Sequence, residues 1–287
     1  MPDREFRLVS AADGLTLQGY AWRARGSSKG AVALSHGAAE HALRYERFAC
    51  ALAGAGFDIF ALDQRGHGRS AAPGGLGDFG AGGWAALVAD LGQLVEFARA
   101  TQPGVRVALF GHSMGSFAAQ HFCLDRSHAI DALVLSGSTA LDVSRTGGAP
   151  QAFAFNAAFE PARTPYDWLS RDPAEVDKYV ADPLCGFETQ GGRRPGAGID
   201  FAAIADPAAL KRIRADLPVL LVAGDADPIN AKLAGLHLLE GRWRDAGVRR
   251  IDTQYYAGGR HEMLNETNRD EVTRCIAVWL GAALAGE

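Results

Sequence analysis

The pentapeptide G-H-S-M-G at residues 111–115 has the residue types and the spacing of a serine nucleophile. A short apolar run at residues 105–110 precedes it, and residues 116–124 follow with a helical pattern. A sharp strand–turn–helix passage exposes a serine hydroxyl, and glycines on both sides let the two backbones approach closely. We therefore take Ser113 as the candidate nucleophile.

A serine hydroxyl is a weak nucleophile at neutral pH, so it needs a base and an acid that orients the base. His261 follows the apolar stretch at residues 251–256 and is the candidate base. Asp225 and Asp227 both follow the apolar stretch that ends near residue 223, and either could reach the histidine. Active sites of open α/β sheets form outside the carboxyl ends of strands, where these side chains fall.

Acyl chemistry on a serine also needs two N–H donors for the oxyanion. The residue after the nucleophile, Met114, supplies one of them. The second comes from a loop after an earlier strand, and residues 36–41 form such a loop. Gly37 permits close backbone approach there, so the N–H of Ala38 is the natural second donor. We expect His36 and His41 to shape this loop through hydrogen bonds.

The elements that must position these residues follow from the apolar pattern. Residues 6–22 alternate in character around Asp13-Gly14, which predicts a hairpin. Continuous apolar strands then alternate with helical patterns, and this predicts an α/β fold with a doubly wound, mostly parallel, eight-stranded sheet. The expected strands after the hairpin are 31–35, 58–62, 105–110, 132–136, 219–223 and 251–256, and the expected helices are 45–55, 82–100, 116–127, 232–246 and 268–285.

One segment interrupts this alternation. About 80 residues separate the strand that ends near Ser136 from the next one, and a structureless loop of that length is improbable in a compact domain. We predict a mostly helical cap at residues 138–211 over a core of residues 1–137 and 212–287. The cap has many large apolar side chains, namely Phe153, Phe155, Phe159, Tyr166, Trp168, Tyr179, Phe187 and Phe201.

Composition excludes several classes of partner. The 287 residues have a net charge of −4 and contain no basic run, so no nucleic-acid partner is expected. No apolar stretch is long enough for a transmembrane segment, although transient contact with lipid is compatible with the sequence. The charged N-terminus and four scattered cysteines favour a cytoplasmic location. Without zinc spacing or a G-x-G-x-x-G turn, we expect no metal and no cofactor.

Taken together, the motifs resemble those of the lysophospholipase and monoacylglycerol-lipase group of α/β-hydrolases, of the serine aminopeptidase S33 type. The resemblance covers residues 6–137 and 212–285 and is weak in the cap. It rests on five segments: H-G-A-A-E-H with R-Y at 36–45, D-Q-R-G-H-G-R-S at 63–70, G-H-S-M-G at 111–115, G-D-A-D-P at 224–228 and G-G-R-H-E at 258–262.

The resemblance implies an α/β-hydrolase fold and assigns the acid to Asp227. The implied catalytic residues are Ser113, Asp227 and His261, with an oxyanion hole made by Ala38 and Met114. It also implies a small-molecule ester as substrate, with lipid-like acyl chains, and no cofactor. An amidase, an aminopeptidase or a carbon–carbon hydrolase with the same triad is the alternative within enzymes. A non-catalytic small-ligand receptor is the alternative outside them.

Overall fold

A computed structural model describes residues 1–72, 75–140, 155–187 and 198–286. It confirms the predicted eight-stranded α/β sheet, whose strand order is β1-β2-β4-β3-β5-β6-β7-β8. The first two strands form the predicted hairpin, and the remaining six strands are parallel to one another. The strands are β1 (Arg4–Val9), β2 (Thr16–Trp22), β3 (Gly30–Ser35), β4 (Phe57–Leu62), β5 (Val107–His112), β6 (Ala132–Ser136), β7 (Val219–Gly224) and β8 (Ile251–Tyr256).

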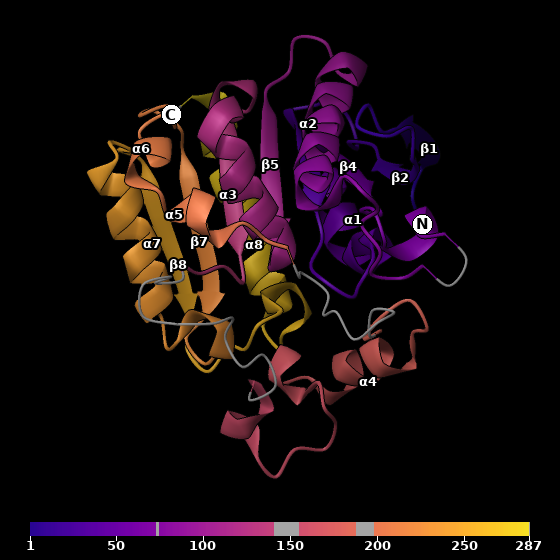
Figure 1. Cartoon of the computed structure of the whole chain (residues 1–287), viewed down its shortest axis with the longest axis vertical. Coiled ribbons are helices and arrows are strands. Elements are labelled where there is room, and N and C mark those ends of the chain that lie inside the picture. The colour runs from indigo at the N-terminus through magenta and orange to yellow at the C-terminus, as the bar shows by residue number, and fades with distance from the viewer. Residues whose placement is uncertain (73–74, 141–154, 188–197, 287) are drawn as a thin grey trace.

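Helices cover both faces of this sheet (Figure 1). Helices α2 (Gly83–Thr101), α3 (Met114–Arg126) and α7 (Ala234–Asp245) pack on one face. Helices α1 (Glu46–Gly54) and α8 (Arg269–Ala285) pack on the other. The central strands, β3 to β7, are buried along their whole length, which explains why their sequences are continuously apolar.

The described part of the expected cap lies beyond the carboxyl ends of the strands, around helix α4 (Pro173–Ala181) (Figure 1). It has a small apolar cluster of its own, formed by Leu169, Tyr179 and Cys185. Helices α5 (Phe201–Ala205) and α6 (Pro207–Leu210) lie within the expected cap boundaries, but they contact α3 and pack against the apolar cluster on that face of the sheet. Phe153, which we assigned to the cap, lies outside the described residues.

Short 3-10 turns occur in several of the connections. They are η1 (Ala42–Tyr45), η2 (Gly68–Ser70), η3 (Ser127–Ala129), η4 (Phe155–Phe159), η5 (Asp167–Leu169), η6 (Pro228–Asn230) and η7 (Met263–Asn265). Within the described ranges, none of the helices combines the length and the apolar character that crossing a membrane requires.

Candidate active site

Ser113 is the single residue between β5 and α3. Its backbone has φ +51° and ψ −118°, which is a strained conformation for a residue with a side chain. The flanking glycines make the turn feasible, because a Cβ atom at Gly111 would lie 2.5 Å from the Gly115 carbonyl oxygen. A Cβ atom at Gly115 would collide with the Ser35 carbonyl oxygen. This geometry presents the hydroxyl of Ser113 at the carboxyl end of the central strand.

His261 and Asp227 meet at the same edge of the sheet. The Nδ1 atom of His261 lies 2.9 Å from Oδ2 of Asp227, and both side chains are buried. The competing acid, Asp225, instead accepts the backbone N–H of Gly258 at 2.7 Å. The structure therefore brings Asp227, and not Asp225, to the candidate base.

The nucleophile and the base are neighbours but are not hydrogen-bonded. The His261 ring lies 4.8 Å from the ring of His112, which immediately precedes Ser113. Among the hydrogen bonds of the described residues, none joins the Ser113 hydroxyl to His261. Such bonds are often long in free enzymes and shorten when substrate binds.

Two backbone donors beside Ser113 have no acceptor among the described residues. Within the described part of the chain, the N–H groups of Ala38 and Met114 donate no hydrogen bond. The loop that carries Ala38 is close to the nucleophile, since a Cβ atom at Gly37 would lie 3.2 Å from Cβ of Ser113. One free N–H at the start of α3 and one on this loop form a pair of donors that is suited to stabilise an oxyanion.

Buried side chains hold the loop that carries Ala38. Glu40 accepts the N–H of Gly37 and the hydroxyl of Tyr45, the latter at 2.7 Å. His67 accepts the N–H of Ala39 through Nε2 at 3.2 Å. Burial lowers the pKa of His67 to about 3, so this imidazole stays neutral and keeps its acceptor.

Like His67, His36 is a buried histidine that binds backbone groups at this loop. Its Nε2 atom accepts the N–H of Gln64 at 2.9 Å, and its Nδ1 atom lies 2.7 Å from the Gly37 carbonyl oxygen. Burial lowers the pKa of His36 to about 3. Both of its nitrogens are engaged with backbone, which agrees with the loop-shaping position that the sequence suggests.

An ion-pair network that sequence reasoning missed connects this loop to the histidine loop. Arg44 binds both oxygens of Glu262 at 2.7 and 2.8 Å, and it also binds Glu40 at 2.6 Å. Burial favours the neutral carboxyl of Glu262, but Arg44 outweighs it and lowers the pKa of Glu262 to about 2. A single guanidinium thus binds both carboxylates, and through them it joins the oxyanion loop to the histidine loop.

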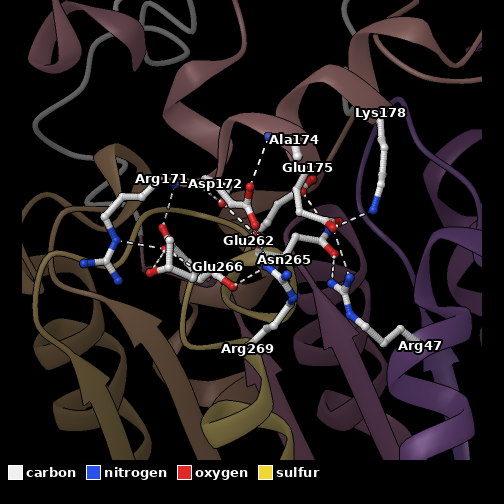
Figure 2. A network of polar contacts seen from close by, with 12 residues as sticks. Arg47, Arg171, Asp172, Ala174, Glu175, Lys178, Glu262, Asn265, Glu266 and Arg269 are labelled. Carbon is white, nitrogen blue, oxygen red and sulfur yellow. Dashed lines mark hydrogen bonds and ion pairs between the residues drawn. The ribbon is translucent and has the colours of Figure 1, made fainter.

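A second set of polar contacts joins residues of the expected cap to the segment around η7 (Figure 2). Arg171 pairs with the buried Glu266, and Arg47 pairs with Glu175 on α4. Arg269, at the start of α8, pairs with Asp172, the N-cap of α4. These pairs place the described cap against the segment that follows His261.

In the described chain, one group of metal-ligating side chains is close together. Single ligand atoms of His41, Asp182 and Cys185 lie within 4.8 Å of one another. His41 already pairs with Asp182 at 2.8 Å. Burial outweighs the nearby positive charge of Arg44 and raises the pKa of the Cys185 thiol well above its usual range. The thiol therefore stays protonated, whereas the thiolate is the form that binds a metal, so we assign no metal to this group.

The pKa of His261 predicts the pH dependence of catalysis. Burial acts to lower this pKa, but Asp227, Glu262 and Glu40 together raise it above its ordinary value of 6.5. His261 must be neutral to act as a base, so we expect kcat/KM to rise with pH through a midpoint above 6.5. The sequence alone predicts about pH 6–7, the range of a free histidine. A profile that is flat from about pH 5 to 8 for a chemistry-limited ester would contradict this assignment.

An eight-stranded sheet of this order, with a serine in the strained turn between strand and helix, defines an α/β-hydrolase. The chain belongs to the serine aminopeptidase S33 family, whose model matches residues 26–268. It is 32% identical over 276 residues to a monoacylglycerol lipase of Mycolicibacterium smegmatis, with 90% of each chain covered. It is 28% identical over 296 residues to a monoglyceride lipase of Mus musculus, covering 100% of this chain and 95% of the relative.

Solved structures have the same fold. A carboxyl esterase of Bacillus coagulans superimposes with a TM-score of 0.86 at 24% identity, over 99% of both chains. A monoacylglycerol lipase of Paleococcus ferrophilus superimposes with a TM-score of 0.69 at 26% identity, over 93% of this chain and 99% of the other. Fold and family together identify the chain as an enzyme of the α/β-hydrolase class.

Proposed function

We propose that this enzyme hydrolyses carboxylic esters with lipid-like acyl chains, of the monoacylglycerol or lysophospholipid type, through an acyl-enzyme on Ser113. The observation that carries the proposal is the buried pair of His261 and Asp227 beside Ser113, together with the free N–H groups of Ala38 and Met114. The monoacylglycerol and monoglyceride lipases among its relatives support the substrate class.

The proposed reaction has two stages. The Ser113 hydroxyl attacks the ester carbonyl while Nε2 of His261 takes its proton, and the oxyanion binds to the two free N–H groups. His261 then gives the proton to the leaving alcohol. Water then attacks the acyl-enzyme while His261 takes a proton from it, and His261 returns this proton to the Ser113 oxygen as the carboxylic acid leaves. Throughout, Asp227 accepts from Nδ1 of His261 and stabilises the imidazolium that forms.

We further propose that the acyl chain lies against the cap, for which we retain the boundaries 138–211. Aromatic side chains of the described cap approach the site: the Trp168 ring lies 4.9 Å from His261, and the Phe187 ring lies 5.4 Å from His67. Phe155 packs on Trp168 at 4.7 Å. Leu169, Tyr179 and Cys185 form the cap's own core, so we propose that Trp168 and Phe187 are the cap side chains that contact the acyl chain.

An aminopeptidase is the second candidate, because the family as a whole takes its name from that activity. A free α-amine of a substrate would need an unpaired carboxylate near Ser113. Glu40 and Glu262 are the buried carboxylates that pair with Arg44 beside the site, and this pairing makes them poor amine receptors. We therefore favour ester substrates over aminoacyl amides.

A series of p-nitrophenyl esters from acetate to palmitate, run beside aminoacyl anilides, tests the proposed substrate class. Each methylene buried against the cap contributes about 0.8 kcal/mol, or nearly fourfold in kcat/KM. We expect kcat/KM to increase with acyl length until the pocket is full, with an optimum among short-to-medium acyl groups or monoacylglycerol-like esters and poor cleavage of the anilides. Preference for the anilides, or for acetate over every longer ester, would contradict the proposal. Absence of turnover on every ester and amide would favour the small-ligand receptor.

A further inference from the structure

The cap holds the oxyanion loop at the carbonyl group of Ala39, in addition to the pairing of Asp182 with His41. The carbonyl oxygen of Ala39 accepts the Tyr179 hydroxyl at 2.9 Å and the N–H of Gly186 at 3.0 Å. Ala39 follows Ala38, the proposed oxyanion donor, and has φ +54°, which favours glycine. His67 of the core binds the N–H of the same residue. Ala39 is thus fixed in a strained conformation by the core on one side and by the cap on the other.

The cap also holds the proposed base. The Trp168 ring lies 4.9 Å from the His261 ring at an interplanar angle of 34°, and the Trp168 carbonyl oxygen accepts the N–H of His261 at 3.4 Å. Trp168 is itself fixed on both sides. Its backbone N–H donates to Oδ1 of Asn156 at 2.9 Å, and its ring packs on Phe155. The indole therefore has a defined position against the imidazole.

We propose that the cap is a working part of the active site, in which Tyr179 positions the oxyanion loop and Trp168 positions His261 and stabilises its charged form. This inference rests on the proposed acyl-enzyme mechanism. On this proposal, the enzyme is catalytically competent when the cap lies against the site as it does in this structure. A cap that moved away would withdraw both supports at once.

The two positioning residues should have different kinetic signatures. Tyr179 acts on the loop that binds the oxyanion, so its loss should lower kcat and leave the pH profile unchanged. Trp168 presents an aromatic face to an imidazole that becomes a cation during turnover, and such contacts stabilise the cation. Its loss should therefore lower the pKa seen in the kcat/KM profile.

Other groups around His261 set the baseline for that shift. Asp227 after β7, Glu262 beside His261 and Glu40 on the oxyanion loop raise the pKa of His261. His112 at the end of β5 is neutral, because burial and His261 itself lower the pKa of His112 to about 4. None of these groups changes when Trp168 is replaced, so the shift reports on the indole.

The first test uses Tyr179→Phe, with Tyr256→Phe as its matched control. The hydroxyl of Tyr256 donates to Gln254 on β8 at 3.1 Å and makes no contact with the oxyanion loop. We expect Tyr179→Phe to lower kcat about threefold to tenfold, as loss of one hydrogen bond allows, with KM and the kinetic pKa unchanged. A kcat equal to that of Tyr256→Phe, or a loss carried entirely by KM, would overturn the assignment of Tyr179.

The second test compares Trp168→Leu with Trp168→Phe. Both variants keep an apolar group over His261, but only phenylalanine keeps an aromatic face. We expect the kinetic pKa to fall by about half a unit in Trp168→Leu and to stay near the wild-type value in Trp168→Phe. Equal pKa values in the two variants, or a higher value in Trp168→Leu, would overturn the assignment of Trp168.

The rate at which a fluorophosphonate labels Ser113 is the second readout for all four variants. This reaction uses the oxyanion loop and His261 but does not depend on which ester the enzyme prefers. If the wild-type protein is labelled but turns over no ester, the proposed function fails, while the labelling rates of Tyr179→Phe and Trp168→Leu still test the cap. Slower labelling than in Tyr256→Phe and Trp168→Phe, respectively, supports the inference, and equal rates refute it.

Discussion

Ser113→Ala should lower kcat for ester hydrolysis by roughly 10⁵- to 10⁶-fold while the protein stays folded. The hydroxyl oxygen is the atom that would form the acyl-enzyme, and the turn between β5 and α3 contains no other nucleophilic side chain. Stability should be retained because this hydroxyl donates no hydrogen bond among the described residues. Steady-state kinetics with a p-nitrophenyl ester, combined with a thermal melt, measures both effects.

Ser116→Ala is the control for this variant. Ser116 is buried in the first turn of α3, and its hydroxyl lies 2.7 Å from the Ser113 carbonyl oxygen and 2.8 Å from Oγ of Ser138. Its removal should lower the melting temperature and spare most of kcat. If Ser113→Ala kept more than about a hundredth of the wild-type kcat, Ser113 would not be the nucleophile, since loss of a triad member normally costs far more.

Asp227→Asn should lower kcat by roughly 10³- to 10⁴-fold. An asparagine at this position cannot hold the proton on Nδ1 of His261, so the imidazole adopts the wrong tautomer and its cationic form loses a countercharge. The size of the loss in kcat distinguishes an acid that orients His261 from a residue that only contributes to packing. It is measured as kcat at a pH well above the kinetic pKa.

Asp225→Asn is the matched control, two residues away in the same turn. The side-chain amide oxygen of the asparagine can still accept the N–H of Gly258, as the Asp225 carboxylate does. We expect less than about a tenfold loss of kcat from this change. A large loss in Asp225→Asn with a small one in Asp227→Asn would reverse the assignment of the acid.

The parallel sheet was predictable because its strands are continuously apolar. Two predicted strands, 132–136 and 251–256, coincide with β6 and β8. The predicted strand at 105–110 is instead β5 at Val107–His112. Gly111 and His112, which the sequence motif places in the turn, still pair with β6. Accordingly, α3 begins at Met114, two residues earlier than predicted.

The cap was less predictable. Its described part has one helix of nine residues, α4, with short turns before it and α5 and α6 after it. Prolines at 161 and 165 interrupt any helical period before Pro173, which is the first residue of α4. The apolar content of this segment predicts that it packs, but it does not predict which aromatic side chains approach His261 and which form the cap's own core.

Local motifs predicted Ser113, His261 and the loop of Ala38 as parts of the site. The residues alone did not decide whether Asp225 or Asp227 is the acid. The distinction comes from the turn after β7: Oδ1 of Asp227 accepts the N–H of Ile229 at 2.9 Å, which leaves Oδ2 for His261. The pairing of Arg44 with Glu262 spans 218 positions and leaves no local signal in the sequence. Contacts of this kind depend on the packed structure, as do those of Tyr179 and Trp168 with the site.

Mapping the residue that a fluorophosphonate modifies tests the proposed mechanism most directly. Wild-type protein is labelled, digested and analysed by peptide mass spectrometry, with ester turnover measured on the same sample. We expect one adduct, on Ser113, whose formation parallels the loss of ester hydrolysis and which is absent from Ser113→Ala. Labelling at another residue that parallels the loss of activity, or full ester turnover by protein labelled at Ser113, would contradict an acyl-enzyme on Ser113.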